Sequence, residues 1–186
     1  MSKQLILFNG PRHSGKDTAA DHVWRTFENV RRFKMSRPLK DGIKAFFDLT
    51  DAQVAYLEQN KTKPDDLLFG NSYVDTQISL SEHWAKEFFG ITVFGKLAAR
   101  ELATSASTLF VCSDSGFAYE AEPIVRTIGK ENTLLIRLHR PGKTFDGDSR
   151  SYIEMPGVMT LDLHNAGEVF KFQQQVQQVV QAWLNR

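Results

Sequence analysis

The feature that most constrains this chain is a glycine-rich segment, GPRHSGK, at residues 10–16. It matches the spacing G-x-x-x-x-G-K. Residues 5–8 before it form a continuous apolar run, whose length and flanking Asn9-Gly10-Pro11 predict a buried strand. Residues 16–29 after it carry apolar side chains at helical spacing. A strand that enters a helix through this loop predicts a phosphate-binding loop (P-loop) in an α/β fold.

Each part of the loop has a physical role in binding phosphate. Glycines at both ends let the backbone bend so that successive N–H groups point at phosphate oxygens, and the helix start adds partial positive charge. Lys16 can reach the β- and γ-phosphates, and we expect its side chain to be exposed before a ligand binds. The alternative is a glycine-rich turn that binds nothing. The residues expected to bind the nucleotide here are Gly10, Arg12, His13, Ser14, Gly15, Lys16, Asp17 and Thr18.

Two aspartates are candidate ligands for Mg²⁺. Asp17 stands where such loops usually carry a Ser or Thr hydroxyl, and it could hold the ion directly or through water. Thr18 is the nearest hydroxyl if the register differs. Asp114 follows an apolar strand at 108–112, which we expect beside the strand of the phosphate loop. The alternatives are a first-turn acid for Asp17 and a helix cap or turn residue for Asp114.

The rest of the chain alternates between strand and helix patterns, which predicts a parallel sheet with helices on both faces. Residues 59–75, with a proline, a glycine and many polar side chains, are interpreted as a loop. Further strands are expected at 30–35, 133–138 and 158–163. Helices are expected from 38 onwards and at 51–58, 76–90, 92–104, 118–128 and 166–185.

Composition limits the partners and the compartment. The formal net charge of +1 gives no general attraction to nucleic acid or to an anionic membrane. The single cysteine, Cys112, leaves no disulfide framework and is interpreted as an inert core residue. No apolar run approaches membrane-spanning length, and the first residues show no signal-peptide pattern. We expect a cytoplasmic monomer or homodimer that binds small molecules and neither a nucleic-acid polymer nor a membrane.

Three further segments, together with Gly15-Lys16-Asp17, carry a resemblance to a known family. They are Ser36-Arg37-Pro38-Leu39-Lys40-Asp41, Leu138-His139-Arg140-Pro141-Gly142 and Asn165-Ala166-Gly167. In these, in order along the chain, the sequence resembles the bacteriophage deoxynucleoside monophosphate kinases of the P-loop nucleoside monophosphate (NMP) kinase superfamily. It is more distantly similar to animal-type phosphomevalonate kinases.

The resemblance implies a single P-loop kinase domain over 1–186 that uses ATP and Mg²⁺. It implies an NMP-kinase-like three-layer sandwich whose five-stranded parallel sheet has the order 2-3-1-4-5. It further implies a substrate-binding segment at about 37–75, a lid segment at about 139–155, and nucleotide binding by Asn165. If phage-encoded, the enzyme would act in the host cytoplasm.

The chain departs from the family at Asp114-Ser115-Gly116, where the family often has Asp-x-Arg. Two alternatives therefore stay open beside a deoxynucleoside monophosphate kinase. One is a small-metabolite kinase of the phosphomevalonate type, and the other is a non-catalytic ATP-binding regulatory protein.

Basic residues in two segments are candidates for the acceptor and transition-state charges. Arg37 and Lys40 lie one helical turn apart and could hold the acceptor phosphate; a solvated basic face is the alternative. Arg140, on the lid segment, is the candidate for a catalytic role beside Lys16 and Asp114, because arginines on a closing loop neutralise charge and exclude water. Arg150 is a candidate substrate ligand. Arg137 could instead pair with solvent or a carboxylate at a strand end.

A set of aromatic residues could stack on an acceptor base, but helical spacing favours the core, and we interpret the set as core. Its members are Phe46, Phe47, Trp84, Phe88, Phe89 and Phe94.

Overall fold

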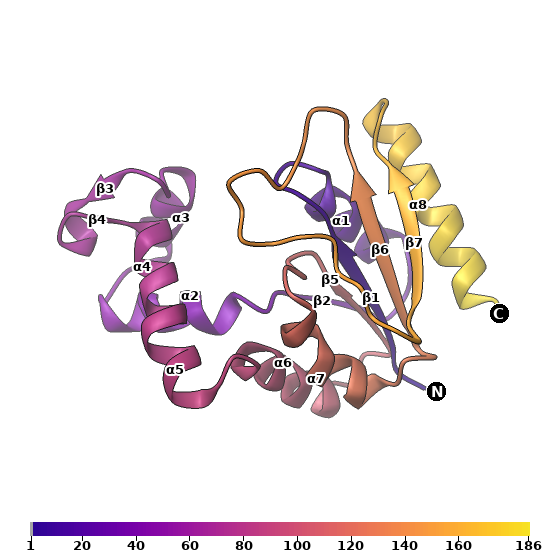
Figure 1. Ribbon diagram of the computed structural model, residues 1–186, viewed down its shortest axis with the longest axis horizontal. Helices are drawn as coiled ribbons and strands as arrows, with labels where there is room; N and C mark the ends of the chain where they lie inside the picture. Colours follow the sequence, from indigo (N-terminus) through magenta and orange to yellow (C-terminus); the bar gives the residue numbers. More distant parts are fainter. Residues whose placement is uncertain (1) are drawn as a thin grey trace. The chain divides into compact units, whose positions relative to one another are not determined.

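The computed structural model describes residues 2–186 (Figure 1). These residues form two compact units. The first contains residues 2–35 and 95–186, and the second contains residues 36–94. The expected phosphate loop, residues 10–18, and the expected lid segment, residues 139–155, both belong to the first unit. The expected substrate-binding segment, 37–75, lies inside the second.

The first unit is built on a five-stranded sheet in which every neighbouring pair is parallel. Its strands are β1 (Gln4–Asn9), β2 (Val30–Phe33), β5 (Leu109–Cys112), β6 (Thr133–His139) and β7 (Met159–His164). Their order is β2-β5-β1-β6-β7, which is 2-3-1-4-5 when these five alone are numbered along the chain. The predicted α/β class and the five-stranded parallel sheet are confirmed.

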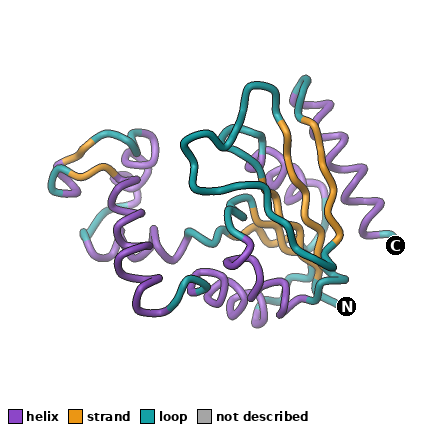
Figure 2. Tube along the Cα trace, viewed as in Figure 1, coloured by secondary structure: helices purple, strands orange, loops and turns teal. Residues whose placement is uncertain are grey.

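Helices cover both faces of this sheet, as Figures 1 and 2 show. Ile6 and Phe8 of β1 pack in one core with α1 (Lys16–Thr26) and α8 (Val169–Leu184). Leu5 and Leu7 are equally buried and, by the alternation of a strand, face the opposite side, where α7 (Ala118–Ile128) contacts β1. Helix α6 (Val93–Thr104) precedes β5. Burial on both faces explains why β1 is a continuous apolar run.

The second unit is mostly helical, and part of our interpretation of it was wrong. Residues 59–75 are not one loop, because Ser72 caps a helix that begins at Tyr73, and Tyr73 is fully buried. The segment also contains a short antiparallel hairpin, β3 (Pro64–Asp65) with β4 (Asn71–Ser72), around a 3₁₀ turn, Asp66–Leu68. The unit's other helical elements are α2 (Arg37–Phe46), α3 (Asp51–Gln59), α4 (Tyr73–Leu80), a π-helical turn (Ser81–Ala85) and α5 (Lys86–Phe89).

The assignment of the aromatic set to the core was also wrong for most of its members. Phe46 is 81% exposed, and Trp84, Phe88 and Phe89 are each more than half exposed, whereas Phe94 is buried. The buried stripe of α2 consists of Leu39 and Ile43 alone. Exposed rings instead pack on one another, with Phe47 contacting both Phe46 and Phe69 and with Trp84 contacting Phe89.

Smaller differences occur at helix ends. Helix α1 ends at Thr26 rather than at 29, because Phe27 is extended and Asn29 has a positive φ. Trp24 on α1 and Val169 and Phe170 on α8 lie largely outside the core. Cys112 is buried, and burial raises the pKa of its thiol well above the ordinary value, as expected for an inert core residue. Between residues 2 and 186, no helix is long and apolar enough to cross a membrane.

Candidate phosphate-binding site

The phosphate loop lies at the carboxyl edge of the sheet, directly after the central strand β1. Strands β5 and β6 flank β1 in parallel, so the segments that follow all three strands reach the same edge of the sheet. The long segment between β6 and β7 also starts there (Figure 2). Our expectation that the strand before Asp114 lies beside the phosphate-loop strand is confirmed.

Two neighbours fix the conformation of the loop at Gly15. Gly15 has a φ of 106°, and a Cβ atom there would lie 2.6 Å from Asn165 Nδ2 and 3.1 Å from a ring carbon of Phe172. The Asn165 side-chain amide donates to the Ser14 carbonyl at 2.9 Å. Asn165, expected to bind nucleotide, therefore holds the loop's backbone in this structure. The glycine is required both for its φ and for this close approach.

The first turn of α1 leaves backbone donors available at the loop. The first intrahelical bond is from Ala19 N to Gly15 O, so the N–H groups of Lys16, Asp17 and Thr18 precede it. No side chain in the described part of the chain caps this helix. An uncapped helix start preceded by a glycine loop is a ready site for a phosphate oxygen.

Lys16 is half-buried, so our expectation of an exposed side chain was wrong. Its Nζ donates to Gly10 O at 2.7 Å and to Pro11 O at 2.6 Å, which folds the side chain back over the loop. Burial, and secondly the positive charge of Arg150, lower the pKa of Lys16 to about 8. A bound phosphate would add negative charge beside this ammonium, and it would replace the two backbone carbonyl groups as hydrogen-bond acceptor.

Residues from the lid segment meet the same loop. Arg140 Nη1 donates to the carbonyl of His13 at 3.0 Å, across 127 residues of sequence. Arg150 lies close enough to Lys16 for its charge to affect the lysine's pKa, and its side chain packs against Gly116. The structure thus brings Arg140 and Arg150 to the phosphate loop.

Arg137 is placed differently, and the alternative of a carboxylate partner is confirmed. Its guanidinium contacts both carboxylate oxygens of Asp162, at 3.0 and 2.7 Å, from the adjacent strand in register. These hydrogen bonds raise the pKa of Arg137. The ion pair ties β6 to β7 beside the lid segment.

Both candidate metal ligands are carboxylates at this edge. Asp17 Oδ1 accepts from Ser113 Oγ at 2.7 Å and from Lys34 Nζ at 3.0 Å. Burial would raise the pKa of Asp17, but these two hydrogen bonds outweigh it and hold the pKa below its ordinary value. Asp114 Oδ1 accepts from the backbone N–H of Met35 at 2.9 Å, which links the loop after β5 to the end of β2. Asp17 is thus kept ionised, with a side chain 69% exposed.

The carboxylates of Asp17 and Asp114 are oxygen ligands of the kind that Mg²⁺ prefers. Magnesium is usually held by one or two carboxylates with water and substrate phosphates, rather than by an all-protein cage. Within residues 2–186, no group of three or more His, Cys, Asp or Glu side chains is placed to hold a metal ion.

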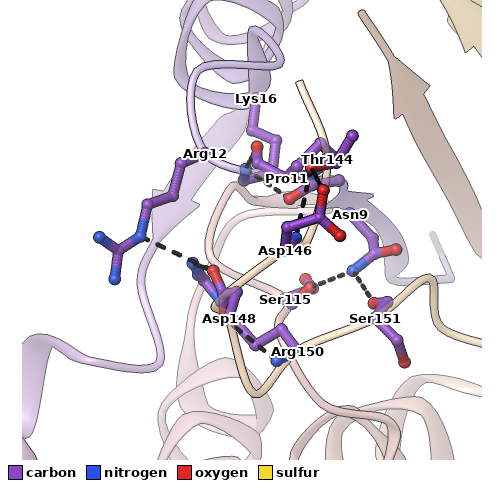
Figure 3. A network of polar contacts seen from close by, with 11 residues as sticks. Asn9, Pro11, Arg12, Lys16, Ser115, Thr144, Asp146, Asp148, Arg150 and Ser151 are labelled. Carbon is purple, nitrogen blue, oxygen red and sulfur yellow. Dashed lines mark hydrogen bonds and ion pairs between the residues drawn. The ribbon is translucent and has the colours of Figure 1, made fainter. Parts of the chain in front are cut away.

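Two residues at the carboxyl edge of the sheet were not predicted from the sequence as site residues. Asn9, at the end of β1, is almost completely buried and bonds to three backbone groups, Ser115 O, Ser151 O and Ile153 N. Asp148 lies between Arg12 and Arg150 (Figure 3). Asn9 could have been suspected from its position between the strand and Gly10. Nothing in the sequence distinguishes Asp148 from the other polar residues of its basic segment.

The expected acceptor residues lie in the second unit, in the first turn of α2. Lys40 forms an ion pair with Glu58 of α3, and Arg37 is exposed. Their role stays a prediction. Ser14 and Thr18 complete the predicted set: Thr18 is half-buried, and the Ser14 hydroxyl is fully buried with no hydrogen-bond partner within residues 2–186.

The chain is similar to two known proteins whose names or titles contain the word kinase. No family model matches the chain. A protein of Acanthamoeba polyphaga mimivirus named "Putative deoxynucleotide monophosphate kinase" is 28% identical over an alignment of 172 residues, and the alignment covers 86% of this chain and 86% of that protein. An unliganded structure titled as a sugar kinase from Janibacter sp. HTCC2649 has a TM-score of 0.49 and 14% identity, over all of this chain and 95% of that one.

Proposed function

We propose that the chain is an ATP-dependent phosphotransferase whose acceptor is a deoxynucleoside monophosphate. The observation that carries the proposal is that Lys16 and Arg140 both contact the phosphate loop. Lys16 begins the helix after β1, and Arg140 follows β6, yet both side chains donate to carbonyl groups of residues 10–13. A loop that only binds nucleotide needs no second cation carried on a long, separate segment.

In this proposal the donor is held by residues 10–18. The free N–H groups at the start of α1 would bind β- and γ-phosphate oxygens, and Lys16 would exchange its two carbonyl partners for phosphate. The buried Asn165 would keep the loop in its bent form through its bond to Ser14. Phosphoryl transfer requires little covalent chemistry of the protein, so positioning and charge neutralisation do most of the work.

Arg140 and Arg150 would act on the transferring group. Both are always charged, and their planar guanidinium groups match the geometry of phosphate oxygens. In a closed lid segment they would also exclude water, which otherwise competes as acceptor. Asp17 and Asp114 would hold Mg²⁺, which when bound would neutralise charge on the β- and γ-phosphates.

Arg37 and Lys40 are the proposed ligands of the acceptor phosphate. Support for a nucleotide acceptor comes from the mimivirus relative's name and from the segment Ser36-Arg37-Pro38-Leu39-Lys40-Asp41, which resembles the substrate-side helix of the phage enzymes. Lys40 would have to exchange Glu58 for the acceptor.

A coupled assay of ADP release tests this proposal. The chain is supplied with ATP, Mg²⁺ and, in turn, dAMP, dCMP, dGMP, dTMP, phosphomevalonate or no acceptor. The proposal expects release above the no-acceptor rate with at least one deoxynucleoside monophosphate, and its loss in Lys16→Ala. Release with phosphomevalonate alone would move the assignment to a metabolite kinase. Nucleotide binding without release under any condition would contradict catalysis.

A further inference from the structure

Asp148 contacts two arginines that we expect to bind phosphate, Arg12 and Arg150. Its Oδ1 accepts from Arg150 Nε at 2.8 Å and from the Arg150 backbone N–H at 3.1 Å, and its Oδ2 contacts Arg150 Nη2. Arg12 Nε lies 3.7 Å from Oδ2. The side chain of Asp148 is only 11% exposed. A two-oxygen contact with one arginine and a second arginine beside it is also how proteins hold a phosphate group.

Three cations lie around Asp148, and Asp114 is a second carboxylate whose charge acts on two of them, Arg150 and Lys16. Arg12 and Arg150 contact it, and Lys16 is close enough that the Asp148 charge raises and the Arg150 charge lowers the lysine's pKa. Hydrogen bonds from Arg150 hold the pKa of Asp148 at about 2, so it is an anion at any physiological pH. Figure 3 shows these side chains together beside the loop.

Arg150 would stay beside the loop if Asp148 moved away, because the chain just after it is fixed independently. The buried Asn9 side chain donates to Ser151 O at 3.3 Å and to Ser115 O at 2.9 Å, and it accepts from Ile153 N at 3.0 Å. The Arg12 contact is the weaker of the two, since it is longer and the Arg12 side chain is 67% exposed.

From this geometry we propose that Asp148 is an internal competitor of phosphate, which holds Arg12 and Arg150 until a polyphosphate group displaces it. The proposal rests on the proposed function, because it assumes that the loop binds a nucleotide. Its consequence is a lowered affinity: part of the attraction between phosphate and the two arginines is used to separate them from Asp148. Removing the charge of Asp148 should therefore tighten binding.

The test is isothermal titration calorimetry with ATP and with inorganic tripolyphosphate, both without divalent cation. Asp148→Asn removes one negative charge with little change of shape, and we expect the dissociation constant to fall about tenfold for both ligands. Asp146→Asn is the matched control, because it makes the same charge change on the same segment while Asp146 is bonded to Thr144 rather than to an arginine. Adding Arg12→Gln to Asp148→Asn should remove part of the gain.

Each outcome decides the question. Equal or weaker binding by Asp148→Asn, or an equal gain in Asp146→Asn, overturns the inference. Asp148→Ser serves as a second variant if the Asp148→Asn protein does not fold. If neither variant folds, Asp148 is required for the fold, and the inference that a ligand displaces it is contradicted. Failure of both wild type and Asp148→Asn to bind polyphosphate overturns the inference together with the proposed function. Binding by the variant alone also overturns the inference, because polyphosphate then fails to displace Asp148 from the arginines of the wild type.

Discussion

Nucleotide binding should draw a proton onto Lys16 at mildly alkaline pH. In the free chain, burial and the nearby Arg150 charge lower the pKa of Lys16 to about 8. At pH 8.5 about three quarters of the molecules would then carry a neutral amine, against about a tenth at pH 7. Phosphates beside Nζ favour the ammonium form, so binding at pH 8.5 requires the uptake of about three quarters of a proton.

The same arithmetic gives a pH dependence of affinity. Since the charged lysine binds phosphate and the neutral one does not, the dissociation constant should rise about tenfold between pH 7 and pH 9. The direction of this pH dependence follows from the lowered pKa of Lys16 in the free chain. Because bound phosphate favours the protonated lysine, affinity is highest below pH 8 and falls as the lysine loses its proton above pH 8.

Calorimetry measures this uptake directly. ATP without divalent cation is titrated at pH 8.5 in buffers of different ionisation enthalpy, and the slope of the observed enthalpy against that quantity gives the number of protons. Lys16→Arg is the control, because arginine stays charged over this range and should show no uptake. A slope of zero for the wild type at pH 8.5 would refute the reasoning, as would an equal slope in Lys16→Arg.

Three substitution experiments test the other roles. Lys16→Ala should lower the rate of transfer on the order of 10²–10³-fold while the thermal unfolding transition stays cooperative, and near-normal turnover would remove the site assignment. Asp17→Asn and Asp114→Asn should each weaken the Mg²⁺ dependence more than the metal-free nucleotide affinity; unchanged magnesium titrations would leave them as structural hydrogen-bond acceptors. Arg37→Ala should chiefly raise the acceptor KM, whereas Arg140→Ala should lower kcat, and the opposite pattern in steady-state kinetics would reverse the two assignments.

The fold could be predicted because its signals are local. The run at 5–8, the glycine loop and the helical spacing after it are contiguous, and together they predicted β1, the loop and α1. The position of Asp114 beside the phosphate loop was predictable too, because parallel strands bring their carboxyl ends to one edge.

What the sequence missed depends on contacts between distant segments. The partners of Asn9 are more than a hundred residues away along the chain, and no spacing rule relates them. Asp146 and Asp148 lie in the same polar segment, but Asp148 contacts Arg12 and Arg150 whereas Asp146 bonds to Thr144. Phe46 has the spacing of a core residue but lies outside the narrow buried stripe of a short helix. Helical periodicity shows that residues share a face, and packing decides whether that face is covered.

The most direct test of the central claim is to follow the γ-phosphate itself. ATP labelled with ³²P at the γ position is incubated with the chain, Mg²⁺ and each deoxynucleoside monophosphate, and the nucleotides are separated by thin-layer chromatography. The account predicts that label appears in at least one deoxynucleoside diphosphate, and that Lys16→Ala leaves it in ATP. Label that reaches only inorganic phosphate, or that never leaves ATP with any acceptor, would contradict it.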